Sequence, residues 1–220
     1  MRQDFDLPDR FTITAHSGCE HTPDNTILSI ERAFESGADV TEIDLSFNKD
    51  GVPVLSHDKP KGGEPTLAEA FRKLADCAPM QMNIDVKSTD NLTEVRRLAE
   101  ESGVLDRVFY TGVSEEFLDA VRTQTPMIPY YLNADLPVPE KQTDEFLQEL
   151  IRTVRCAGAI GINAHHGNVS SRLVGTAHKN GLLFSIWTVD HKSDMLRVLG
   201  FAPDNITTRK PSALRQLIEE

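Results

Sequence analysis

Carboxylate and lysine side chains alternate with apolar ones in two short segments that could bind a metal ion together with a phosphate. Glu42 and Asp44 stand in the segment TEIDLS, and Asp85 and Lys87 stand in the segment NIDVK. The alternation has the period of a β-strand, so each pair lies on one face of its strand. Because carboxylates are costly to bury unless a cation compensates them, three of them beside a lysine indicate a divalent cation that handles a phosphate.

Eight apolar strand candidates alternate with amphipathic helix candidates along the chain. Several helix candidates have recognisable ends, such as the capping box formed by Thr66 and Glu69. Eight parallel strands alternating with helices are most simply an α/β fold of the (β/α)8 TIM barrel type, and we expect one such domain over residues 1–220. We expect strands at residues 11–15, 40–45, 81–86, 108–111, 127–131, 159–162, 183–189 and 205–208, an extra strand at 52–55, and helices at 26–36, 66–75, 91–102, 114–122, 143–155, 170–180, 192–199 and 211–219, with one long loop at 134–141.

The barrel also predicts where the chemistry takes place, because active sites in TIM barrels lie at the carboxyl ends of the strands. The candidate residues that lie on a predicted strand near its end, or directly after one, are His16, Glu42, Asp44, Asp85, Lys87, Trp187, Asp190 and Arg209. We therefore expect all of these side chains to meet at one mouth of the barrel.

The composition excludes several classes of protein. A formal charge of −11 and an isoelectric point near 5.1 argue against a nucleic-acid or anionic-membrane surface. No apolar run approaches the length of a membrane span, and the first residues form no signal-peptide core. The three cysteines are widely spaced, which predicts reduced thiols. We expect a cytoplasmic enzyme with a small-molecule substrate, and the sequence indicates no oligomeric state.

Several segments closely resemble the glycerophosphodiester phosphodiesterase family. The resemblance is specific over residues 14–58, where AHSG, PDNT, EID, KDG and HD follow one another, and it continues through DVK, WTV and NITT further along the chain. It implies a metal-dependent phosphodiesterase on a TIM barrel, which hydrolyses glycerophosphodiesters to glycerol phosphate and an alcohol. Carried over by motif, the resemblance implies His16 and His57 as the acid–base pair, Glu42, Asp44 and Asp85 as the metal ligands, and Lys87 as a phosphate contact.

The chain departs from the family pattern at several positions. Ser17 replaces the arginine that usually follows the first histidine, and Asp85 replaces a glutamate. The segment between His57 and Thr66 is very short where the family usually inserts a small subdomain. Asp85 and the segment WTVD are similar to the related sphingomyelinase D branch, and Arg209 falls where that branch has asparagine. Arg209 could therefore supply the positive charge that is missing at position 17.

The hard oxygen ligands suit Mg²⁺ or Ca²⁺, whereas zinc would more often recruit histidine or cysteine. One histidine would take a proton from the attacking hydroxyl and the other would protonate the leaving oxygen. We hypothesise that the attacking group is the substrate's own neighbouring hydroxyl, which gives a cyclic phosphate. Lys87 and Arg209 would hold phosphate oxygens, and Trp187 would bound the alcohol or a choline-like head group. Asp190 is a substrate-binding candidate from the resemblance alone.

Other interpretations of these residues stay open. The chain could be a sphingomyelinase D-like or lysophospholipase D-like enzyme that cyclises a lipid phosphodiester, or a barrel that binds a phosphate ligand without turnover. Lys87 could be only an ion-pair partner of Asp85, Trp187 could have a packing role, and Asp190 could hold a loop. Asn25 is expected to shape the turn before its helix rather than touch substrate. The remaining interpretations are Thr26 as that helix's cap, Arg209 as a solvated charge, and His165 and His166 as loop histidines rather than a metal pair.

Overall fold

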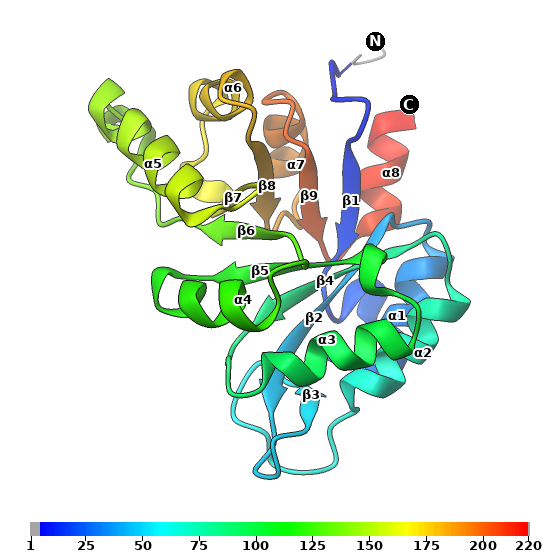
Figure 1. Cartoon of the computed structure of the whole chain (residues 1–220). Helices are drawn as coiled ribbons and strands as arrows, with labels where there is room; N and C mark the ends of the chain where they lie inside the picture. Colours follow the sequence, from blue (N-terminus) through cyan, green and yellow to red (C-terminus); the bar gives the residue numbers. More distant parts are fainter. Residues whose placement is uncertain (1–4, 220) are drawn as a thin grey trace.

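The computed structural model describes residues 5–219 and forms a closed (β/α)8 barrel (Figure 1). The parallel strands run in the order β1-β9-β8-β7-β6-β5-β4-β2, and pairing between β1 and β2 closes the barrel. These strands are β1 (Thr12–Ala15), β2 (Val40–Phe47), β4 (Gln81–Val86), β5 (Val108–Val113), β6 (Tyr130–Asn133), β7 (Gly161–His165), β8 (Leu183–Trp187) and β9 (Asn205–Thr208). The predicted extra strand is β3 (Pro53–Leu55), which pairs antiparallel with β2.

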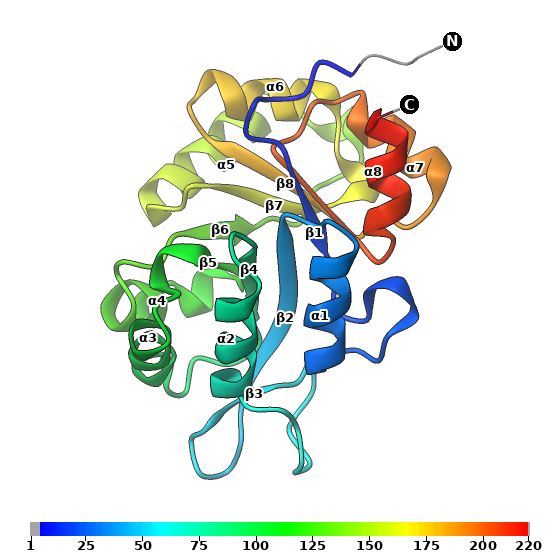
Figure 2. The same cartoon turned by 90° about the vertical axis from the view of Figure 1, so that its right-hand side faces the viewer.

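The helices cover the outside of the barrel, and Figure 2 shows α1 and α2 against the face formed by β1, β2 and β4. They are α1 (Ile27–Glu35), α2 (Leu67–Asp76), α3 (Leu92–Glu101), α4 (Leu118–Gln124), α5 (Asp144–Ala157), α6 (Ser171–Lys179), α7 (Lys192–Leu199) and α8 (Pro211–Glu219). Thr26 caps α1 as expected, and the capping box of Thr66 and Glu69 begins α2. No helix within residues 5–219 is long and apolar enough to cross a membrane.

Three predicted elements begin later in the chain than expected. The strand expected at 127–131 begins only at Tyr130, because Thr125 and Ile128 form a turn and Met127 is exposed. The strand expected at 159–162 begins at Gly161, since the amide of Ala159 still bonds to the carboxyl end of α5. The helix expected at 114–122 starts as a 3-10 turn and becomes α4 at residue 118. The long loop at 134–141 ends in a 3-10 turn over Pro139–Lys141.

The two faces of the barrel strands differ in polarity, and polar side chains lie on the face that lines the cavity. Along β4, Met82, Ile84 and Val86 belong to the apolar core. Asn83 and Asp85 alternate with them and face the barrel interior, where they line a cavity. A layer of buried polar side chains continues around the barrel, and it includes Thr14, Asn83, Thr111, Asn163, Ser185, Asn205 and Thr207. The barrel therefore carries polar groups inward, towards the mouth where the strands end.

Candidate active site

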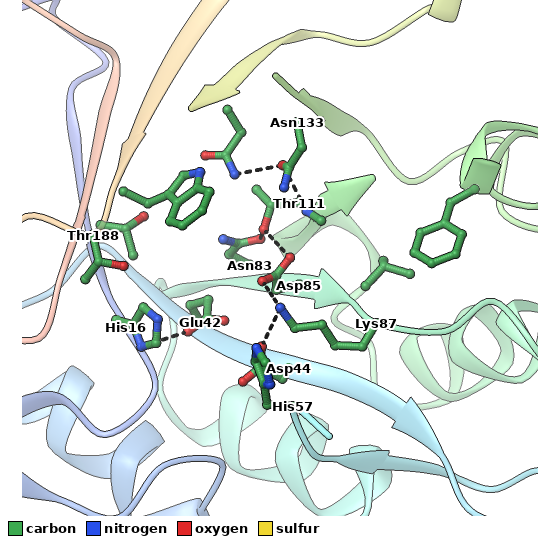
Figure 3. Close-up of a pocket in the computed structure, with 16 residues that line it drawn as sticks. His16, Glu42, Asp44, His57, Asn83, Asp85, Lys87, Thr111, Asn133 and Thr188 are labelled. Atoms are coloured by element: carbon green, nitrogen blue, oxygen red, sulfur yellow. Dashed lines mark hydrogen bonds and ion pairs between the residues drawn. The ribbon is translucent and has the colours of Figure 1, made fainter. Parts of the chain in front are cut away.

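A cavity of about 390 Å³ opens at the carboxyl ends of the strands (Figure 3). The residues that line it are His16, Glu42, Asp44, His57, Asn83, Asp85, Val86, Lys87, Thr111, Gly112, Phe117, Asn133, Asn163, Trp187, Thr188 and Thr207. Seven of the nine predicted site residues are among them. The cavity therefore lies at the mouth where the sequence places the chemistry.

Three carboxylates meet on the side of the cavity formed by β2 and β4. Asp44 and Asp85 are partners in the register of the two parallel strands, and Glu42 lies two residues earlier on β2. Each of the three offers an oxygen within 4.8 Å of the others. Glu42 is 3% exposed, and burial followed by repulsion from Asp44 and Asp85 raises its pKa well above the ordinary value. Burial likewise raises the pKa of Asp85. The cluster therefore favours a cation.

Lys87 lies against this cluster. Its Nζ is 2.8 Å from Asp85 Oδ2 and 3.2 Å from Asp44 Oδ1. Burial alone would lower the pKa of Lys87, but attraction to Asp85 and Asp44 outweighs burial and raises it. Lys87 therefore pairs with Asp85 and Asp44 in this structure, and its contact with a phosphate stays a prediction. Three carboxylates lie near this single ammonium group, so a divalent cation would stabilise their ionised forms.

The loop after β1 holds the carboxylates in place. The backbone N–H of Ser17 donates to Glu42 Oε2 at 2.8 Å. Asn25 forms a two-point clamp on Asp44: its Nδ2 donates to Asp44 Oδ2 at 2.8 Å, and its Oδ1 accepts from Asp44 N at 2.9 Å. Asn25 also has a left-handed backbone with φ of 56°, so it shapes the turn as expected. The sequence pattern does not predict this clamp, because only the folded barrel brings residues 25 and 44 together.

The position of Ser17 explains part of the departure from the family pattern. Ser17 is buried and lies outside the cavity lining, and its hydroxyl accepts a hydrogen bond from the backbone N–H of Asn25. It therefore stabilises the loop rather than presenting a group to a ligand. Among the described residues that line the cavity, Lys87 is the only lysine or arginine.

Gly112 on β5 is a second residue that the sequence analysis missed. Its φ is +70°, and a Cβ atom at this position would lie 2.1 Å from Asp85 Oδ1 and 2.7 Å from the carbonyl oxygen of Val86. The β5–β6 register also shifts between Tyr110 and Val113. Glycine thus allows β5 to approach Asp85 closely. An isolated glycine in a strand is the signal that could have indicated this approach.

The two predicted histidines both line the cavity, in different environments. The Nδ1 atom of His16 is 2.8 Å from the carbonyl oxygen of Ser17. A carbonyl oxygen only accepts, so Nδ1 carries the proton and Nε2 keeps its lone pair. Burial lowers the pKa of His16, and the charge of Arg209 acts in the same direction. His57 follows β3, is largely exposed, and has its Nδ1 3.0 Å from Asp58 Oδ1. The free Nε2 lone pair and the lowered pKa of His16 therefore suit the role of a proton acceptor.

The remaining candidates divide into two groups. Trp187 lines the cavity, and its ring contacts His165 edge-on with centroids 5.4 Å apart. Asp190 and Arg209 lie outside the lining: Asp190 Oδ1 accepts from the Arg209 backbone N–H at 2.7 Å, and the two side chains approach at 3.7 Å. Asp190 therefore holds the loop after β9, and a direct substrate contact by either residue stays a prediction.

His165 and His166 do not form a metal pair in this structure. Their rings are 4.5 Å apart, but His165 Nδ1 accepts from the Gly167 N–H, and His166 Nδ1 accepts from Arg197. Within residues 5–219, the single group of three metal-ligating side chains is that of Glu42, Asp44 and Asp85. His166 lies in the 3-10 turn after β7, but His165 is the last residue of that strand, so the expectation of a loop position was wrong for His165.

Known proteins match this chain in sequence over most of its length. The model of the glycerophosphoryl diester phosphodiesterase family matches residues 16–62 and 60–213. A glycerophosphodiester phosphodiesterase of Caldanaerobacter subterraneus subsp. tengcongensis is 26% identical over 94% of this chain and 98% of its own length. The Bacillus subtilis enzyme of that name is 23% identical over 96% and 87%.

Solved structures share the fold. A putative glycerophosphoryl diester phosphodiesterase from Silicibacter pomeroyi superposes with a TM-score of 0.81 at 19% identity, covering 98% of this chain and 95% of its own. An Oleispira antarctica phosphodiesterase, determined in complex with the product sn-glycerol-3-phosphate, also has a TM-score of 0.81, at 18% identity over 97% and 98% of the two chains.

Proposed function

This chain belongs to the glycerophosphoryl diester phosphodiesterase family, and on that basis we propose that it is a phosphoric diester hydrolase that converts glycerophosphodiesters to glycerol phosphate and an alcohol. The observation that carries the proposal is the meeting of three carboxylates, Lys87 and two histidines in one cavity. This combination provides a cation site, a positive charge for the phosphate, and two groups that transfer protons.

We propose that Glu42, Asp44 and Asp85 hold one Mg²⁺ or Ca²⁺ ion. The donors are hard oxygen atoms, and burial followed by repulsion from Asp44 and Asp85 raises the pKa of Glu42, so a cation would stabilise its ionised form. When bound, such an ion neutralises phosphate oxygens and so favours attack at phosphorus. The clamp of Asn25 and the N–H of Ser17 hold two of the three ligands in orientation before the ion arrives.

We assign the proton transfers from the environments of the two histidines. The lowered pKa of His16 keeps its imidazole neutral near pH 7, so Nε2 can accept the proton of the attacking hydroxyl. His57 stands at the open side of the cavity and would donate a proton to the leaving alcohol oxygen. If the substrate's own 2-hydroxyl attacks, a new O–P bond closes a cyclic phosphate as the bond to the alcohol breaks. Water then opens the ring.

The proposal is tested by ³¹P NMR of the protein with glycerophosphocholine and with lysophosphatidylcholine. We expect glycerol phosphate from the first compound and its loss in His16→Ala. A cyclic lipid phosphate formed only from the second would instead favour a sphingomyelinase D-like enzyme. No turnover of either compound, together with tight binding of glycerol phosphate, would indicate a binding barrel. Solvent ¹⁸O incorporated in a single step without a cyclic intermediate would rule out attack by the substrate hydroxyl.

A further inference from the structure

Next to Asp85, the lining of the cavity continues as a wall that is polar but uncharged. Strands β5, β6 and β7 contribute Thr111, Asn133 and Asn163 to it, and Thr188 and Thr207 continue it. None of these five side chains carries a charge, whereas another part of the lining presents carboxylates, a lysine and histidines. The two parts of the lining therefore suit different parts of a ligand, one anionic and the other neutral.

The hydrogen bonds of two asparagines fix which atoms this wall presents. The backbone N–H of Gly112 donates to Asn133 at 3.1 Å, so the accepting atom is Asn133 Oδ1. The same Oδ1 accepts from Asn163 Nδ2 at 2.9 Å. Because a backbone N–H can only donate, both amide orientations follow from this chain of bonds. Two atoms are left over, the donor Nδ2 of Asn133 and the acceptor Oδ1 of Asn163.

These two atoms bond to no other described residue, although Asn163 is buried and Asn133 is partly buried. Asn163 is 6% exposed and still lines the cavity. Because both residues line the cavity, a ligand or solvent molecule there can bond to these two atoms. In Figure 3 the labelled Asn133 lies on the side of the cavity away from Asp44 and His57, beyond Thr111.

The backbone is arranged to hold this pair in register. Asn133 and Asn163 are direct partners on the parallel strands β6 and β7. The irregular pairing of β5 with β6 between Tyr110 and Val113 includes Gly112, whose N–H donates to Asn133. The donor and the acceptor are therefore fixed side by side on strands rather than on loops, as a selective subsite requires.

We propose that Asn133 and Asn163 form a subsite for the hydroxyl groups of an uncharged polyol in the substrate. One hydroxyl accepts from Asn133 Nδ2, and the same or an adjacent hydroxyl donates to Asn163 Oδ1. A quaternary ammonium group cannot make these bonds, because it has neither a lone pair nor an N–H. The inference rests on the proposed function, since it names the part of a phosphodiester that the uncharged wall recognises. The polyol is either the glycerol half or a polyhydric alcohol on the other side of the phosphate.

Two variants change the presented atoms separately. Asn133→Asp keeps both hydrogen bonds to Oδ1 and replaces the free donor by an acceptor, while Asn163→Leu removes the free acceptor at similar volume. Asn48→Asp is the matched control, because Asn48 Oδ1 also accepts from two backbone N–H groups, in the β2–β3 turn, and Asn48 does not line the cavity. It adds the same negative charge without changing the wall.

The first arm of the test measures kcat/KM with glycerophosphocholine and glycerophosphoglycerol. We expect each subsite variant to lose about three- to tenfold, the worth of one hydrogen bond, and the control to stay unchanged. A lower kcat/KM with both substrates would show that the subsite binds the glycerol half of the substrate. A lower kcat/KM with glycerophosphoglycerol alone would show that it binds the alcohol half. An active wild type whose variants lose nothing overturns the inference and leaves the proposed function intact.

The second arm does not depend on turnover. Calorimetry compares the binding of glycerol phosphate and of methyl phosphate, which has no hydroxyl on carbon. We expect the wild type and Asn48→Asp to bind glycerol phosphate more tightly, and both subsite variants to lose this preference. A wild type without the preference overturns the inference, as does a preference that survives in Asn163→Leu. A wild type with the preference but without hydrolysis supports the subsite and refutes the proposed function.

Discussion

Replacing Gly112 by alanine should destabilise the fold and weaken the cation site, because alanine disfavours the left-handed backbone there and its Cβ atom would clash with neighbouring atoms. The left-handed backbone at φ of +70° costs a residue with a Cβ atom about 1 kcal/mol. The new Cβ would also lie 2.1 Å from Asp85 Oδ1 and 2.7 Å from the Val86 carbonyl oxygen. The carboxylate can rotate away, but the Val86 backbone cannot move without separating β5 from β4.

We expect Gly112→Ala to lose about 2–4 kcal/mol in the free energy of unfolding, the sum of the backbone cost and of overpacking. Moving Asp85 removes one of three proposed ligands, so the affinity for Mg²⁺ or Ca²⁺ should fall at least about tenfold. Urea denaturation in EDTA measures the first effect, and calorimetric titration with the metal measures the second.

Gly103→Ala is the matched control for this experiment. Gly103 also has a positive φ, of +65°, but a Cβ there would meet no atom within 4 Å. It should therefore lose only the backbone cost of about 1 kcal/mol and keep its metal affinity. Equal destabilisation of the two variants, with unchanged metal binding in both, would refute the close approach of β5 to Asp85.

Three further predictions concern the carboxylates and His16. Asn25→Ala removes the clamp on Asp44 and should lower metal affinity about 10- to 100-fold in a calorimetric titration; unchanged affinity would show that Asp44 needs no support. Because the pKa of Glu42 is raised in the folded state, the metal-free protein is most stable at low pH and loses stability as the pH rises through that pKa. A metal ion that binds ionised Glu42 should offset this loss, so the gain in Tm on adding metal should grow from pH 5 to pH 8. A gain independent of pH would exclude Glu42 as a ligand. Because burial lowers the pKa of His16, the acid limb of kcat/KM assigned to it should lie below pH 6.5, and a limb above that value would contradict its role as proton acceptor.

The sequence was sufficient to predict the barrel and the carboxylate side of the cavity. Strand periodicity put Glu42 and Asp44 on one face, and the rule that barrel sites lie at strand ends brought Asp85 and Lys87 beside them. Both inferences depend only on local pattern and on topology. The structure confirms this arrangement, since residues 44 and 85 are register partners.

The uncharged side of the cavity could not be predicted in the same way. Asn133 lies outside the strand expected at 127–131, and its orientation depends on a hydrogen bond from Gly112 at a shifted register. The clamp of Asn25 on Asp44 likewise joins residues that only the closed barrel brings together. Such details follow from register and from side-chain networks, which no short segment of sequence specifies.

The most direct test of the account is to locate the metal ion by crystallography. Crystals grown with Mn²⁺, whose anomalous scattering distinguishes it from water, and with glycerol phosphate would show the ion and the phosphate together. We predict one ion bound by oxygen atoms of Glu42, Asp44 and Asp85, with the phosphate between this ion and His16. An ion bound elsewhere, or a phosphate bound in this cavity with no ion beside it, would contradict the central claim.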